Sequence, residues 1–215
     1  MISRSLLAHP ARVDCLFVFS LITSSSCMRL TAEHVITVAR ALVDEDGLDA
    51  LTTRRLGARL GVKGPALYRH FQSKQDIIDA LGRTFFVGPA EPTAIDTWQD
   101  WLEQRARSTR REILSCRDGA RILAMARPNL AEGGRLERLL EPLTKAGFDT
   151  TEAILASHTV GRFVIGWTMS EQENDGKIPP ASAGIDPELG FEFALKSLIA
   201  GLEMQLIAKK MASPS

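Results

Sequence analysis

The chain has 215 residues, 45% of them hydrophobic, with 26 basic and 26 acidic side chains, so its formal net charge is zero. This length allows one large domain or two small ones, and the neutral total gives no sign of a nucleic-acid partner for the molecule as a whole. The three cysteines, Cys15, Cys27 and Cys116, form no CxxC pair and have no nearby histidine pairs. This argues against a disulfide framework or a structural zinc site and fits a reducing cytoplasm.

Residues 1–27 stand apart from the rest of the chain. Their apolar run, residues 15–22, is far shorter than the ~20 residues that a membrane helix needs, so we expect no membrane segment. Two interpretations remain open: a weak signal-peptide core, or an upstream extension or poorly ordered arm before a natural start at Met28. The extension is favoured, because the segment 24–27 lacks a clean small-x-small cleavage pattern and a well-formed helix follows directly.

From Thr31 on, the sequence has helical periodicity and no strand alternation, so the predicted fold is all-α. Capping residues, glycines and a proline mark four helices in the first part of the chain. The expected signals are Thr31 and Gly47 for the first helix, Thr52 or Thr53 and Gly61 for the second, Gly64-Pro65 for the third, and Ser73 for the fourth, 74–86.

The second part of the chain is predicted to be helical as well. Residues 88–97 contain two prolines and are predicted to form a linker, and Arg117-Asp-Gly119 is a break. The expected helical segments are 98–114, 120–125, 132–146, 150–171 and 188–210, with a loop at 174–187.

A strongly basic stretch lies in the first part of the chain. Between Thr52 and Gln75 there are six basic residues and no acidic one, in contrast to the acidic end of the preceding helix. A helix, a short glycine-containing turn and a second helix make the helix-turn-helix pattern, whose second helix enters the major groove of DNA. A solvated basic helix pair that docks an acidic partner is the alternative, but it does not explain why charge, turn and exposed aromatic character coincide. The basic residues are Arg54, Arg55, Arg59, Lys63, Arg69 and Lys74.

Residues 51–74, and above all the LYxHxxxK pattern of residues 67–74, resemble the DNA-binding domain of the TetR family of repressors. Segments of the second part are similar to the ligand-binding domain of the tetracycline repressors within that family, so the resemblance covers about 28–210. After the extension at 1–27, it implies a helix-turn-helix domain (28–75) and a ligand-binding and dimerisation domain (76–212). The similar segments are 97–101, 116–120, 127–128, 146–148, 160–163 and 201–205.

The resemblance also implies which residues meet operator DNA. From chemistry alone, Tyr68 can give its hydroxyl to a phosphate, Arg69 can donate to guanine and Ala66 can touch a thymine methyl. Gly64 and Ala66 stand where the tetracycline repressors have glutamine and threonine, so a different operator is expected. The implied DNA contacts are Thr53, Arg54, Lys63, Pro65, Ala66, Tyr68, Arg69, His70 and Lys74.

The same resemblance implies a homodimer, formed through the helices at about 150–171 and 188–210. These helices carry more apolar surface than one small domain easily covers. An ordinary pair of core helices is the alternative. In a homodimer, two-fold symmetry would place two recognition helices about 34–36 Å apart on a palindromic operator.

The small-molecule site is expected to differ from that of the tetracycline repressors. Leu123, Ala126 and Ser170 stand at the positions that hold Mg²⁺ there, and none supplies the ligands that Mg²⁺ prefers. Because the positions around them are mostly apolar, we expect a mainly apolar effector. If Arg105 is a buried cation, the effector should also carry an acid or a phenolate. Alternatively, Arg105 could pair with an internal glutamate or point to solvent. The other implied effector residues are Thr109, Arg127, Pro128, Leu139, Ile154, Ser157 and His158.

These expectations combine into a ligand-controlled switch without enzyme activity. The effector would shift the 120–130 segment, which would move the helix at 74–86 and separate the recognition helices. The four histidines are scattered and no GxSxG, HExxH or glycine-rich phosphate loop is present, so neither catalysis nor a cofactor is expected. The alternative function is a helical small-molecule-binding protein that acts as a ligand-dependent activator or a sequestering module.

Overall fold

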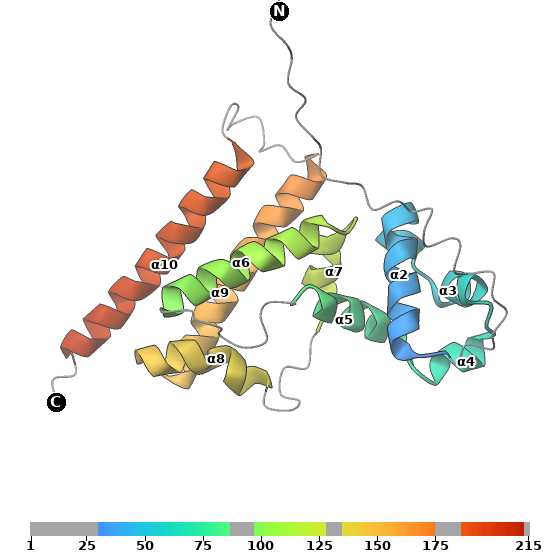
Figure 1. The fold of residues 1–215 in the computed structure, drawn as a ribbon, viewed down its shortest axis with the longest axis horizontal. Helices are drawn as coiled ribbons and strands as arrows, with labels where there is room; N and C mark the ends of the chain where they lie inside the picture. Colours follow the sequence, from blue (N-terminus) through green and yellow to red (C-terminus); the bar gives the residue numbers. More distant parts are fainter. Residues whose placement is uncertain (1–29, 87–96, 128–134, 175–185, 213–215) are drawn as a thin grey trace, which may run out of the picture. The chain divides into compact units, whose positions relative to one another are not determined.

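The computed structural model describes residues 30–86, 97–127, 135–174 and 186–212. The predicted extension at 1–27, the linker apart from Thr97 and most of the predicted 174–187 loop lie outside these ranges. All regular structure within the described ranges is helical (Figure 1), which confirms the all-α prediction. The elements are α2 (Ala32–Asp46), the 3-10 turn η1 (Leu48–Ala50), α3 (Thr53–Leu60), α4 (Gly64–Tyr68), α5 (Lys74–Thr84), α6 (Trp98–Leu114), α7 (Gly119–Met125), α8 (Arg135–Ala146), α9 (Thr150–Glu173) and α10 (Pro187–Ala212).

The first four helices begin and end close to the residues that the sequence predicts. The Thr31 hydroxyl accepts from the His34 N–H, and the Thr52 hydroxyl accepts from the Arg55 N–H, both at 3.2 Å. Ser73 and Asp76 form a reciprocal capping box at the start of α5. Gly61 ends α3 with a φ of +66°, the left-handed conformation that glycine adopts without steric cost.

We refer to α2, η1, α3 and α4 as the head and to α6–α10 as the core; α5 follows the head and packs against both α2 and α7. The inner faces of these elements are apolar. In the head and α5, the fully buried side chains include Leu42, Leu56, Leu67, Ile77 and Leu81. Their burial is the main stabilising contribution to this helical arrangement.

In the core, α9 and α10 run antiparallel and α6 packs against both (Figure 1). The direction is clear from an ion pair that joins Glu152, near the start of α9, to Lys209, near the end of α10, at 2.5 Å. The packed faces of α9 and α10 are formed by Ala153, Ala156, Val160, Val164, Phe191, Leu195 and Ile199.

Candidate DNA interface and effector-binding core

The short helix α4 has one buried face and one exposed face. Leu67 and Phe71, four residues apart, are 0% and 6% exposed and anchor the helix to the head. Tyr68 lies between them in sequence but is 51% exposed, and Arg69 and His70 are exposed as well. The last residue of α4 and the two residues that follow it thus display an aromatic ring and two cationic or polar side chains to solvent, where they are available to a partner.

The nine residues predicted to contact DNA all lie on α3, α4, the turn between them, or the segment from α4 to the first residue of α5. Thr53 and Ala66 are half-buried, and the side chains of Arg54, Lys63, Tyr68, Arg69, His70 and Lys74 are exposed. Thr53 and Arg54 form the first turn of α3, where free backbone N–H groups favour a phosphate. The structure therefore brings the predicted residues together on neighbouring elements, while their contacts with DNA stay a prediction.

Two of the six basic residues in this stretch are paired with the acidic end of α2. The Arg55 guanidinium lies 2.5 Å from a carboxylate oxygen of Asp46, and the Arg59 guanidinium donates to Glu45. The sequence shows that the end of α2 is acidic, but it does not reveal these pairs, because they depend on the packing angle of α2 against α3. Among the described residues, no ion pair involves Arg54, Lys63, Arg69 or Lys74.

The end of α7 lies directly against α5. The Gln75 side-chain amide donates to the Met125 carbonyl at 3.0 Å, and the Arg127 backbone N–H donates to the Asp79 carboxylate at 2.8 Å. A Cβ placed on Gly82 would lie only 2.3 Å from the Cβ of Ala126, so the two backbones approach more closely than any larger residue would allow. The end of α7 and α5 are therefore in direct contact at this point.

The turn before α7 is hydrogen-bonded to the head. Helix α7 is therefore joined to α5 at its C-terminal end and to the head at its N-terminal end. Asp118 has a φ of +57°, and its carboxylate accepts a hydrogen bond from the Leu48 N–H at 2.7 Å. The Arg117 N–H donates to the Asp44 carboxylate at 2.9 Å. The side chain of Gln172 on α9 fixes this turn, because it accepts from the Ala120 N–H and donates to the Cys116 carbonyl.

The residues predicted to bind an effector have different exposures. Leu123 and Thr109 are buried, at 5% and 8% exposure, whereas His158 is exposed. Pro128 lies outside the described residues. Arg127 is exposed, and the remaining predicted residues are half-buried: Arg105, Ala126, Leu139, Ile154, Ser157 and Ser170.

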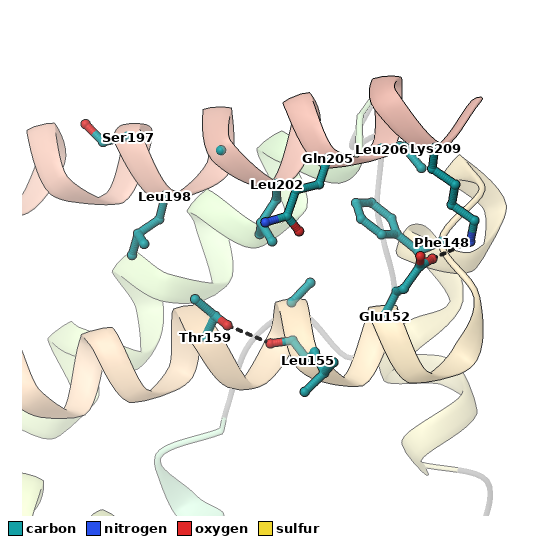
Figure 2. A pocket seen from close by; sticks show the side chains of 12 residues that line it. Phe148, Glu152, Leu155, Thr159, Ser197, Leu198, Leu202, Gln205, Leu206 and Lys209 are labelled. Carbon is teal, nitrogen blue, oxygen red and sulfur yellow. Dashed lines mark hydrogen bonds and ion pairs between the residues drawn. The ribbon is translucent and has the colours of Figure 1, made fainter. Parts of the chain in front are cut away.

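Two grooves that open on the described part of the core are lined by other residues than those predicted to bind an effector. One, of about 310 Å³, lies between α9 and α10, with Leu155, Leu198 and Leu202 on its walls (Figure 2). The other, of about 400 Å³, lies near Arg110, Leu114 and the start of α10. The predicted effector site thus stays a prediction that rests on the positions of its residues.

The buried arginine of α6 is Arg110 rather than Arg105. The Arg105 side chain is half-buried, with its guanidinium carbon 5.6 Å from the ring centroids of both Phe86 and Trp101. The Arg110 side chain is only 13% exposed and lies 2.7 Å from a carboxylate oxygen of Glu171, whose side chain is 6% exposed. The hydrogen bond from Arg110 to Glu171 raises the pKa of Arg110 above its ordinary value. The sequence pattern could not reveal this pair, because residues 61 positions apart form it.

Helices α9 and α10 also carry exposed apolar side chains. Leu155 on α9 is 59% exposed, and Phe193, Met204 and Met211 on α10 are 75%, 66% and 77% exposed. Side chains of this size are usually covered in a stable protein when several occur close together. The groove in Figure 2 belongs to the same pair of helices.

Two other kinds of feature do not occur in the part of the chain that the structure describes. It contains no cluster of three or more histidine, cysteine, aspartate or glutamate side chains that could hold a metal ion. None of the helices in these ranges combines the length and apolar character required to cross a membrane.

Both parts of the chain match known protein families. Residues 35–81 match the family model described as bacterial regulatory proteins, tetR family, and residues 89–184 match the model described as tetracyclin repressor-like, C-terminal domain. The tetracycline repressor protein class A from transposon 1721 of Escherichia coli is 34% identical over 209 residues, which are 86% of this chain and 97% of that protein. The class D tetracycline repressor of the same species is 33% identical over 201 residues, 84% of this chain and 92% of that protein.

Solved structures show the same similarity. A TetR variant from Acinetobacter baumannii AYE in complex with minocycline superposes with a TM-score of 0.72 at 37% identity, covering 82% of this chain and 98% of that one. TetR (class A) in complex with 5a,6-anhydrotetracycline and magnesium gives 0.68 at 35% identity, covering 81% and 99%. With an N-terminal helix-turn-helix domain and a helical C-terminal domain that both match, the chain belongs to the TetR family of transcriptional regulators.

Proposed function

We propose that the protein is a repressor that binds a palindromic operator as a homodimer and releases it when a small molecule binds in the core. The observation that carries this proposal is the outward face of α3 and α4. There, Arg54, Lys63, Tyr68 and Arg69 are exposed on a helix-turn-helix scaffold and take part in no ion pair among the described residues. Phosphates need such cations, and base edges need such side chains at a helix that fits the major groove.

The test is binding to DNA from upstream of the protein's own gene, measured by fluorescence anisotropy across a range of salt concentrations. Arg54→Ala should weaken binding by about fivefold or more, and it should reduce the slope of log K against log salt by about 0.9 for each phosphate that the protein no longer neutralises. Arg111→Ala removes one exposed positive charge from α6, outside the helices proposed to form the dimer, and serves as the matched control. Equal weakening of binding in the two variants would contradict a contact at Arg54. If the wild-type protein bound no duplex, the proposed function would be contradicted.

The homodimer is supported by the exposed apolar side chains of α9 and α10. A second copy that packs its own α9 and α10 across this face would cover Leu155, Phe193 and Met204 and fill the groove between the helices (Figure 2). Two recognition helices related by a two-fold axis would then meet successive major grooves. The anisotropy titration tests this as well, because saturation should require two protomers for each operator duplex.

The effector is proposed to be a mainly apolar small molecule other than a Mg²⁺–tetracycline chelate. The support is chemical, since Leu123 and Ala126 have hydrocarbon side chains and Ser170 offers a neutral hydroxyl. Mg²⁺ prefers carboxylate, carbonyl and water oxygens in octahedral geometry. The relatives named above are tetracycline repressors, so this is where the chain is proposed to differ from them.

Isothermal titration calorimetry with tetracycline, in the presence and absence of Mg²⁺, tests this difference. We expect no Mg²⁺-dependent heat and a dissociation constant weaker than about 10 μM, which corresponds to less than about 7 kcal/mol of binding free energy. Tight binding that disappears on addition of EDTA would contradict the proposal. Thermal unfolding of the same sample shows that the protein is folded during the titration.

The proposed switch runs through the contact between α7 and α5. An effector that shifts the end of α7 would disturb the Gln75–Met125 and Asp79–Arg127 hydrogen bonds and the close approach at Gly82. The ligand can change the equilibrium only by binding one of the two arrangements better, and a hundredfold difference in affinity supplies about 2.7 kcal/mol.

We propose that this regulator acts in the cytoplasm, where its DNA and a diffusible effector meet.

A further inference from the structure

We infer that Glu45 and Asp46 limit the affinity of the head for DNA of any sequence, because they hold Arg59 and Arg55 away from the phosphates. The inference rests on the proposed function, DNA binding through α3 and α4. It assigns a role to the acidic end of α2, which forms no part of the predicted DNA-binding residues.

The geometry of the two ion pairs is the first support. Arg55 and Arg59 are four residues apart on α3 and therefore share one face of that helix. Both side chains reach across to consecutive residues at the end of α2, where Arg55 meets Asp46 and Arg59 meets Glu45. Two pairs between the same two helix segments hold both guanidinium groups over the acidic end of α2.

The exposure of these groups shows that both arginines lie at the surface, where they could meet a phosphate once their carboxylate partners are removed. The arginine side chains are 46% and 37% exposed, and their carboxylate partners are 41% and 55% exposed. Ion pairs in such a wet environment contribute little to folding, so their removal should leave the head intact. Their effect falls on the charge that the head presents to DNA.

The charge count gives the consequence for DNA. The stretch from Thr52 to Gln75 has six cations, but two are compensated by Glu45 and Asp46, which leaves Arg54, Lys63, Arg69 and Lys74. Sequence-independent affinity grows with the number of phosphates that a protein neutralises. A regulator that must leave its operator on induction, among a large excess of other DNA, benefits when this part of its affinity is kept low.

The experiment measures binding of the full chain to a random-sequence duplex as a function of KCl. Glu45→Gln should free Arg59 in both protomers, adding two phosphate contacts per dimer at about 0.9 each, so the slope of log K against log salt should steepen by about 1.8. The same two contacts should raise affinity on the order of tenfold at about 0.1 M salt. Asp46→Asn should act in the same way through Arg55.

Two controls separate a freed arginine from a general change in charge. Glu33→Gln makes the same charge change in the first turn of α2, at the opposite end of the helix from Glu45. It should leave the slope within about 0.3 of the wild-type value, as expected when no phosphate contact is added. Combining Glu45→Gln with Arg59→Gln should return the slope to the wild-type value, because the freed cation is gone.

The outcomes distinguish this inference from the proposed function. If the wild-type protein binds DNA but Glu45→Gln and Glu33→Gln behave alike, the role of the acidic end of α2 is refuted and DNA binding stands. A rise that persists in the combined variant also refutes it. If the wild-type protein binds no DNA, both proposals fail together. Circular dichroism of each variant verifies that its helices are intact.

Discussion

Replacing Arg110 by methionine is expected to destabilise the protein by about 3–5 kcal/mol, since it leaves the Glu171 carboxylate buried without its cation. The Glu171 side chain is 6% exposed, and its charge is balanced by the guanidinium at 2.7 Å. The same guanidinium also donates to Glu188 and lies 4.6 Å from the ring centroid of Phe191, so α6, α9 and α10 meet at this one side chain. Urea unfolding followed by circular dichroism measures the change.

Arg107 provides the matched control on the same helix. It pairs with Glu192 at 2.6 Å, but its side chain is 37% exposed, so Arg107→Met should cost only about 1 kcal/mol or less. Combining Arg110→Met with Glu171→Met removes both buried charges and should recover much of the stability, because an apolar pair can replace a buried ion pair. Equal destabilisation by the Arg110 and Arg107 variants would show that burial of the ion pair is not the cause.

Replacing Gly82 by alanine is expected to push α5 away from α7. The added methyl group would lie 2.3 Å from the Cβ of Ala126, well inside van der Waals contact, and overpacking of this kind costs about 1–3 kcal/mol. If this contact transmits the effector signal, the variant should also bind operator DNA about tenfold more weakly without any effector, which corresponds to about 1.4 kcal/mol. Unfolding and anisotropy measurements on the same preparation give both values.

The chain offers its own compensating change for this variant. Ala126→Gly removes the methyl group that the new side chain would meet, so the combined variant should regain both stability and operator affinity. Recovery of stability without recovery of operator affinity would separate packing at Gly82 from the proposed switch. In that case the signal would have to pass from α7 to the head by another route.

The helices of the head and α5 could be predicted well because their signals are local. Thr31, Thr52 and Ser73 cap their helices through neighbours three residues away, and Gly61 needs only its own backbone freedom. The core helices α9 and α10 end two residues past their predicted ends, at Glu173 and Ala212, which is within the one or two residues by which helix boundaries ordinarily differ.

Pairings between distant elements could not be predicted from the sequence. The partners of Arg55 and Arg59 depend on how α2 crosses α3, and the burial of Arg110 depends on α9 and α10. The same reason applies to the effector site. Positions such as Thr109 and Leu139 follow from a resemblance, but the space between their side chains depends on how α6 and α8 pack against α9.

The hydrogen bond from the Leu48 N–H to Asp118 joins residues 70 positions apart. Asp118 reaches it from a left-handed conformation that only a minority of non-glycine residues adopt, so the turn is held in place by its surroundings. Local opening of the head therefore has to break bonds to the core, and hydrogen exchange at Leu48 should be as slow as exchange within α6 and α9. The predicted domain boundary after residue 75 separates the DNA-binding part of the chain from the ligand-binding part. In folding, the two parts are expected to behave as one cooperative unit.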